Sequence, residues 1–162
     1  VGNIGNACVG LTALENDIEG LDRFKDNLLR PEAKVEEGLW LNSLKKITSM
    51  MDVSDGLMID LKKIGKILVK TESFTATTGF TEACNLLNLD PISVMLTGGE
   101  DYSLLLTVNP EYSKKLEKDF KDKFGYPLKL IGQVIDKNPG EVVFTKEVEL
   151  KQTSFSHFGG AL

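Results

Sequence analysis

One stretch of the chain changes its hydrophobic pattern abruptly, from an apolar run to an acidic loop and then to an amphipathic segment. Residues 47–51 are mainly apolar, and Asp52-Val53-Ser54-Asp55-Gly56 follows them directly. Beyond this loop, apolar residues recur at helical spacing, at Leu57, Leu61, Ile64 and Leu68. The pattern predicts a strand, an acidic loop and then a helix over residues 56–69.

The rest of the chain mixes helical and strand-like patterns without a regular alternation. Helices are predicted over residues 6–16, from Pro31 to about residue 44, over 81–89 and over 110–124. Strands are predicted over residues 103–108, 128–134, 142–144 and 148–150, with an edge strand over 72–78. We find no repeat or linker, so residues 1–162 are expected to form a single α+β domain with helices packed on a mixed β-sheet.

Composition narrows the class of protein. The 162 residues are 41% hydrophobic and 27% charged, which is typical of a globular domain. The net charge of −5 argues against nucleic acid as the main partner, and no apolar run is long enough to predict a membrane span. Only two cysteines are present, far apart, which favours a reduced cytoplasmic protein. The opening residues 1–6 are typical of a strand end and a glycine turn, which indicates a piece of a longer protein.

The acidic loop is a candidate nucleotide–magnesium site. Asp52 and Asp55 bracket Ser54 at the start of the predicted helix, where unpaired N–H groups favour phosphate oxygens. Two neighbouring carboxylates repel each other unless a cation lies between them, and such oxygen ligands suit Mg²⁺. The alternative is that Ser54 or Asp55 only caps the helix and Asp52 only ends the strand.

A second acidic motif, Gly98-Gly99-Glu100-Asp101-Tyr102, precedes the predicted strand over 103–108. Acids at the mouth of a buried strand are costly unless they are solvated or engaged, although they are also common in plain turns. The motif has some likeness to the hairpin of diguanylate cyclases, but the order of the acids differs. No Walker-type loop or Cys/His metal cluster exists, and the single histidine, His157, makes a Ser-His-Asp triad a poor hypothesis.

Taken together, the motifs resemble a known family. The chain contains, in this order, Val1-Gly2-Asn3-Ile4-Gly5-Asn6-Ala7, Leu29-Arg30-Pro31, Met51-Asp52-Val53-Ser54-Asp55-Gly56-Leu57, Leu96-Thr97-Gly98-Gly99-Glu100-Asp101-Tyr102, Ile131-Gly132-Gln133-Val134 and His157-Phe158. This series is similar to the C-terminal half of thiamine-monophosphate kinases, in the superfamily of aminoimidazole ribonucleotide synthetase. The resemblance spans nearly the whole chain, and the two acidic motifs are its most specific part.

The resemblance implies a fold, a reaction and a set of roles. The fold would be that of the aminoimidazole ribonucleotide synthetase C-terminal domain, and the reaction would convert ATP and thiamine monophosphate to ADP and thiamine diphosphate. Asp52 and Asp55 would bind Mg²⁺, Ser54 would bind the nucleotide, and Glu100 and Phe158 would contact the substrate. No protein nucleophile is expected, because phosphoryl transfer needs positioning and charge neutralisation.

The resemblance also implies what this chain lacks. In the family, an N-terminal half supplies most of the metal and ATP ligands and the homodimer interface, so this chain alone is expected to be inactive. Residues 70–92 depart from the family pattern, Ser103 stands where the family usually has Glu, and Ser154 replaces a common glycine. The alternatives are another ATP-using enzyme of the superfamily, a cyclase-like enzyme, or a non-catalytic phosphate-binding module.

Overall fold

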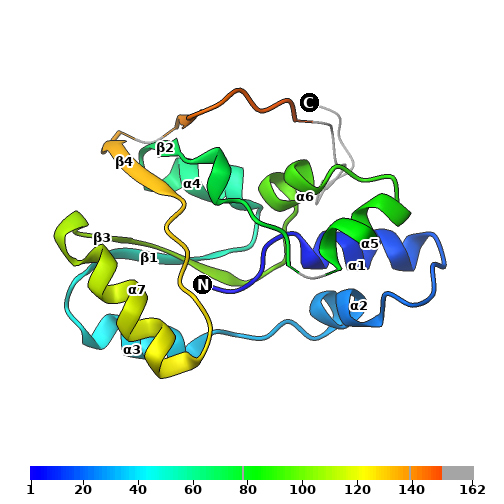
Figure 1. Cartoon of the computed structure of the whole chain (residues 1–162), viewed down its shortest axis with the longest axis horizontal. Helices are drawn as coiled ribbons and strands as arrows, with labels where there is room; N and C mark the ends of the chain where they lie inside the picture. The colour runs from blue at the N-terminus through cyan, green and yellow to red at the C-terminus, as the bar shows by residue number, and fades with distance from the viewer. Residues whose placement is uncertain (78, 139, 151–162) are drawn as a thin grey trace.

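A computed structural model describes residues 1–77, 79–138 and 140–150 (Figure 1). Its helices are α1 (Asn6–Glu15), α2 (Asp22–Leu29), α3 (Val35–Ser43), α4 (Leu57–Ile64), α5 (Phe80–Leu86), α6 (Pro91–Thr97) and α7 (Pro110–Phe124). Its strands are β1 (Ile47–Val53), β2 (Lys66–Val69), β3 (Ser103–Val108), β4 (Gly132–Asp136) and β5 (Val142–Phe144). Within these ranges, no helix is both long and apolar enough to cross a membrane.

The strands form two small sheets. In the first, β1 pairs antiparallel with β3, with Asp52 opposite Leu104 and Val53 opposite Ser103. In the second, β2 lies between β4, which is antiparallel to it, and β5, which is parallel to it. The predicted α+β class with mixed strand pairing is therefore confirmed, although the strands are divided between two sheets.

Three hydrophobic clusters hold the elements together. One includes Phe24 and Phe80 and joins α1, α2, α5 and α6. A second includes Val53 and Leu61 and lies between β1, α4, β2 and β3. The third is built on Leu41 of α3 with two buried residues of α7, Leu116 and Phe120. Figure 1 shows the first cluster's helices at one end of the molecule and α3 and α7 at the other, with β1 and β3 running between.

The predicted helix over 56–69 is wrong in its second half. Helix α4 ends at Ile64, and the chain enters β2 through Gly65. A Cβ on Gly65 would lie 2.6 Å from the carbonyl oxygen of Asp136, so β4 passes too close for any side chain at this position. Leu68, which continues the helical spacing, instead pairs with Gln133 of β4 and Val143 of β5. Pairing with β4 and β5 therefore makes residues 66–69 a strand, although their apolar spacing is helical.

Other predicted element boundaries also differ from those of the structure. Helix α3 begins at Val35 instead of Pro31, β4 begins at Gly132 instead of residue 128, and residues 148–150 are not a strand. The expected edge strand over 72–78 is replaced by a 3₁₀ turn at Thr71–Ser73 and irregular chain up to residue 77. Helix α6 was not anticipated. Its start has a clear signal, because the Asp90 carboxylate accepts from the Ser93 N–H at 2.8 Å and Pro91 is the first helical residue.

Candidate functional site

The predicted strand–loop–helix is present, and Gly56 is its critical joint. Strand β1 ends at Val53 and α4 begins at Leu57. Gly56 is the N-cap residue, with φ of 100° and no side-chain capping bond, so the alternative that Ser54 or Asp55 caps α4 is wrong. A Cβ on Gly56 would lie 2.9 Å from the carbonyl oxygen of Thr97. Only glycine combines this backbone conformation with so close an approach.

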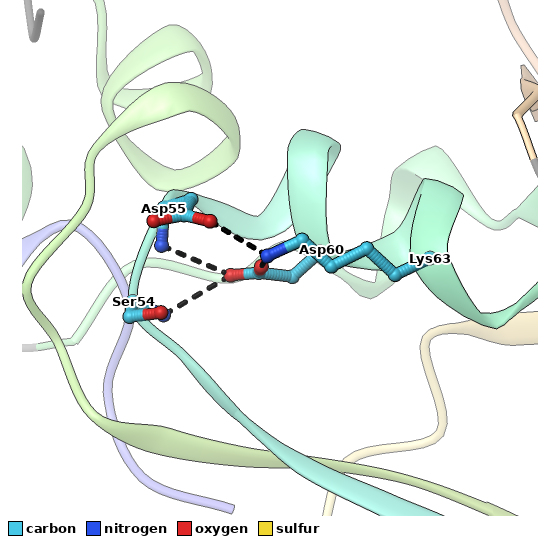
Figure 2. A network of polar contacts seen from close by, with 4 residues as sticks. All are labelled: Ser54, Asp55, Asp60 and Lys63. Atoms are coloured by element: carbon cyan, nitrogen blue, oxygen red, sulfur yellow. Dashed lines mark hydrogen bonds and ion pairs between the residues drawn. The ribbon is translucent and has the colours of Figure 1, made fainter.

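The acidic loop is held from within α4 by Asp60 (Figure 2). The Asp60 side chain is fully buried, and its Oδ2 accepts from the backbone N–H groups of Ser54 at 3.0 Å and Asp55 at 3.2 Å. Lys63 lies one turn further and donates from Nζ to Asp60 Oδ1 and to Asp55 Oδ2, each at 2.6 Å. The loop conformation is thus fixed by a carboxylate and an ammonium from one helix.

Lys63 supplies the positive charge that this cluster requires. Hydrogen bonds to Asp55 and Asp60 raise the pKa of the Lys63 ammonium, so it stays protonated at any physiological pH. The Asp60 carboxylate is buried, whereas the side chains of Lys63 and Asp55 are 45% and 44% exposed. Asp55 therefore combines a fixed position with access to solvent, as a ligand-binding carboxylate needs.

The second acidic motif lies directly against the first. The Glu100 N–H donates to the Ser54 carbonyl oxygen at 2.8 Å, and the Tyr102 N–H donates to the Val53 carbonyl oxygen at 3.0 Å. Both Glu100 and Tyr102 have positive φ, at 64° and 49°, so this loop is held in a conformation that non-glycine residues rarely adopt. The two acidic motifs are therefore neighbours in space, although more than 40 residues separate them in the sequence.

The Glu100 carboxylate is oriented by its own motif. The Tyr102 hydroxyl donates to Glu100 Oε2 at 2.7 Å, and this hydrogen bond is the main reason that the pKa of Tyr102 is raised. The charge of Asp52 raises it further, although by less. Asp52 is exposed near the end of β1, so Asp52 and Glu100 share an acidic surface around Tyr102.

Asp101 has a role that sequence reasoning missed. Its carboxylate accepts from the backbone N–H groups of Gly5 at 2.6 Å and Ala7 at 3.1 Å, at the start of α1. Burial raises the pKa of Asp101 to about 7, outweighing the backbone N–H groups that lower it. The residue therefore ties the glycine turn at residues 2–5 to the second acidic motif. The sequence offered only a weak signal for this contact: a second carboxylate in the motif, and a helix preceded by glycines at the start of the chain.

The remaining predicted features are only partly within the described chain. Ser103, where the family usually has Glu, is buried, and its hydroxyl donates to the Asn3 carbonyl oxygen at 2.9 Å. It is therefore a structural residue that fastens the N-terminal segment. Phe158, Phe155 and Ser154 lie outside the described residues, so the predicted aromatic contact with the substrate stays a prediction.

The oxygen donors of this surface fit Mg²⁺ in type but are few. Carboxylates are the ligands that Mg²⁺ takes from proteins, usually one or two at a time with substrate phosphates completing the shell. Among residues 1–77, 79–138 and 140–150, no group of three or more Asp, Glu, His or Cys side chains is arranged to hold a metal ion. Asp52 and Asp55 could thus contribute to a metal site but would not complete one.

Comparison with known proteins identifies the fold class. The structure matches a thiamine-monophosphate kinase from Stenotrophomonas maltophilia with a TM-score of 0.75 and 26% identity, over 89% of this chain and 48% of that one. It also matches E. coli HypE, a hydrogenase maturation protein, with a TM-score of 0.62 and 16% identity. The chain therefore has the aminoimidazole ribonucleotide synthetase-like fold.

Within this class, the sequence similarity is to one group. Thiamine-monophosphate kinase from Pyrococcus abyssi is 30% identical over 145 residues, which is 86% of this chain and 42% of the relative. The enzyme from Haemophilus influenzae is 31% identical over 144 residues, 83% of this chain and 42% of the relative. No family model matches the chain. The chain is thus a homologue of the thiamine-monophosphate kinases and spans about half the length of these relatives, which confirms the resemblance found in its motifs.

Proposed function

We propose that this chain is the C-terminal half of a thiamine-monophosphate kinase, which uses ATP and Mg²⁺ to convert thiamine monophosphate to thiamine diphosphate in the cytoplasm. The observation that carries the proposal is the contact between the two acidic motifs, in which the Glu100 N–H donates to the Ser54 carbonyl oxygen at 2.8 Å. A solved relative described as AaThiL complexed with AMPPCP and TMP has 26% identity and a TM-score of 0.71 to this chain, which supports an ATP-using kinase.

The roles follow from the geometry of the site. Asp52 and Asp55 would hold Mg²⁺ together with phosphate oxygens of ATP, and Ser54 would contact the nucleotide. Glu100, oriented by the Tyr102 hydroxyl, would face thiamine monophosphate, and Phe158 would stack on its cationic ring. Bound Mg²⁺ would neutralise charge on the transferring phosphoryl group, which is the main requirement of this reaction. Asp60 and Lys63 keep the Ser54–Asp55 turn in place before the metal binds.

The proposal also assigns a role to the N-terminal half of the protein. We propose that it supplies the remaining metal and ATP ligands and the homodimer interface, so the 162-residue chain alone is inactive. The exposed Asp55 carboxylate and the absence of a full ligand set among the described residues are consistent with a site that is shared between two halves.

The test is an assay of thiamine diphosphate formation by the full-length protein and by this chain alone. Full-length protein should be active with ATP and Mg²⁺, and the isolated chain should not. Asp55→Asn in the full-length protein should lower kcat/KM on the order of 100-fold and shift the Mg²⁺ dependence to higher concentration. Asp122→Asn, an exposed carboxylate on α7, is the matched control and should change neither. Full activity in Asp55→Asn would overturn the metal role.

A further inference from the structure

The Lys63 ammonium lies between a carboxylate of the acidic loop and a carboxylate of α4 (Figure 2). Its Nζ donates to Asp55 Oδ2 and to Asp60 Oδ1, each at 2.6 Å. Such short distances are typical of charge-assisted hydrogen bonds, which are stronger than neutral ones. One oxygen of the Asp55 carboxylate is therefore already engaged by a cation that belongs to the chain itself.

Asp60 keeps this ammonium in place. The Asp60 side chain is fully buried, and its Oδ2 accepts from the backbone N–H groups of Ser54 and Asp55. If Lys63 moved away, the buried carboxylate would lose the ammonium that neutralises its charge, which is costly in a protein interior. The Lys63 side chain is 45% exposed, yet its charged end is therefore anchored next to Asp55.

This anchoring limits what Asp55 can offer to a metal ion. While Lys63 holds Oδ2, Asp55 can coordinate a cation through at most one oxygen. Mg²⁺ needs no more, because it usually completes its shell with waters and substrate phosphates. Ca²⁺ accepts more oxygen ligands and often takes both oxygens of a carboxylate. An Asp55 carboxylate restricted in this way therefore suits Mg²⁺ better than Ca²⁺.

We propose that Lys63 is a specificity-determining residue, which favours Mg²⁺ over Ca²⁺ by holding Oδ2 of Asp55. The proposal rests on the proposed function in one respect, that Asp55 is a metal ligand. The charge of Lys63 also repels any divalent cation, but this repulsion is the same for Mg²⁺ and Ca²⁺ at the same position. The preference between the two cations therefore reports the engaged oxygen and not the charge.

The test is a titration of the full-length protein with Mg²⁺ and, separately, with Ca²⁺, followed by the NMR signals of the Ser54 and Asp55 amides. Each titration gives the dissociation constant of one cation at this loop. Lys63→Met removes the ammonium, so both cations should bind more tightly. Because Ca²⁺ also gains the second oxygen of Asp55, the ratio of the Ca²⁺ constant to the Mg²⁺ constant should fall about tenfold.

Three further variants separate the possible causes. Lys62→Met removes a neighbouring exposed charge from α4 and should leave the ratio unchanged. Lys63→Arg keeps a cationic donor for Oδ2 and should retain the parent ratio. Asp55→Asn should weaken the binding of both cations. If it does, an unchanged ratio in Lys63→Met would overturn the role of Lys63 alone, whereas unchanged binding in Asp55→Asn would also overturn the metal role in the proposed function.

A crystal structure of the unmodified full-length protein grown with Mg²⁺ gives a second measurement that needs no substitution. Asp55 should coordinate the ion through Oδ1 alone, with Lys63 Nζ within about 3 Å of Oδ2. Coordination through both oxygens, or a Lys63 side chain displaced from Asp55, would overturn the proposal. An ion that does not contact Asp55 would overturn the metal role as well. Neither measurement uses thiamine monophosphate, so a failure of the proposed kinase activity would be seen separately.

Discussion

Replacing Asp60 by Ala tests whether a buried carboxylate in α4 organises the acidic loop. The change removes the acceptor of two backbone N–H groups, those of Ser54 and Asp55. A buried N–H without a partner costs about 1–3 kcal/mol, and water should compensate part of the loss at Asp55, whose side chain is 44% exposed. The lost ion pair with Lys63 adds at most about 1 kcal/mol, because the Lys63 side chain is 45% exposed.

We therefore expect Asp60→Ala to lower the free energy of unfolding by about 2–4 kcal/mol in urea denaturation. Asp60→Asn keeps one carbonyl oxygen for the two N–H groups and should cost less than Asp60→Ala. Lys63→Ala should cost about 1–2 kcal/mol, less than Asp60→Ala, because the buried Asp60 carboxylate loses its ammonium partner but keeps both backbone N–H groups. Lys62→Ala is the matched control, because Lys62 is an exposed neighbour on the same helix, and it should be neutral.

The refuting result is an Asp60→Ala variant with the unfolding midpoint and slope of the parent chain. Stability unchanged within about 0.5 kcal/mol would mean that the loop does not depend on the carboxylate. A larger effect of Lys63→Ala than of Asp60→Ala would also contradict the reasoning, because it would make the ammonium and not the backbone bonds the principal contribution.

Two further predictions concern Gly56 and Asp101. Gly56→Ala should lower the free energy of unfolding by about 2 kcal/mol or more in urea denaturation, because φ is 100° and the added Cβ meets Thr97. Gly20→Ala is the control: φ is 78° there and nothing lies within 4 Å of the added Cβ, so it should cost only about 1 kcal/mol. Asp101 has a folded pKa of about 7, above its ordinary value of 3.8, so the folded state binds its proton more tightly between these values. The free energy of unfolding should consequently fall as pH rises from about 4 to 7, and Asp101→Asn should lack this contribution when both are unfolded in urea across that range. An identical pH dependence in the two proteins would contradict the assignment.

The sequence by itself determined much of the local structure. Apolar runs interrupted by acids and glycines predicted β1, the acidic loop, the start of α4 and β3, because burial requires such patterns whatever the fold. Asn109-Pro110 and Gly125 correctly bounded α7, because these residues have strong local preferences at helix ends. The two acidic motifs, in their order, were the most specific part of the resemblance to thiamine-monophosphate kinases.

Tertiary structure decided which polar groups meet. Asp60 lies outside the apolar spacing of Leu57, Leu61 and Ile64, yet it is buried because the loop before α4 folds back and presents two N–H groups to it. Asp101 bonds Gly5 from more than 90 residues away, and Gly65 ends α4 because β4 passes beside it. Local periodicity carries no information about such partners, since they are brought together only when the sheets and helices pack.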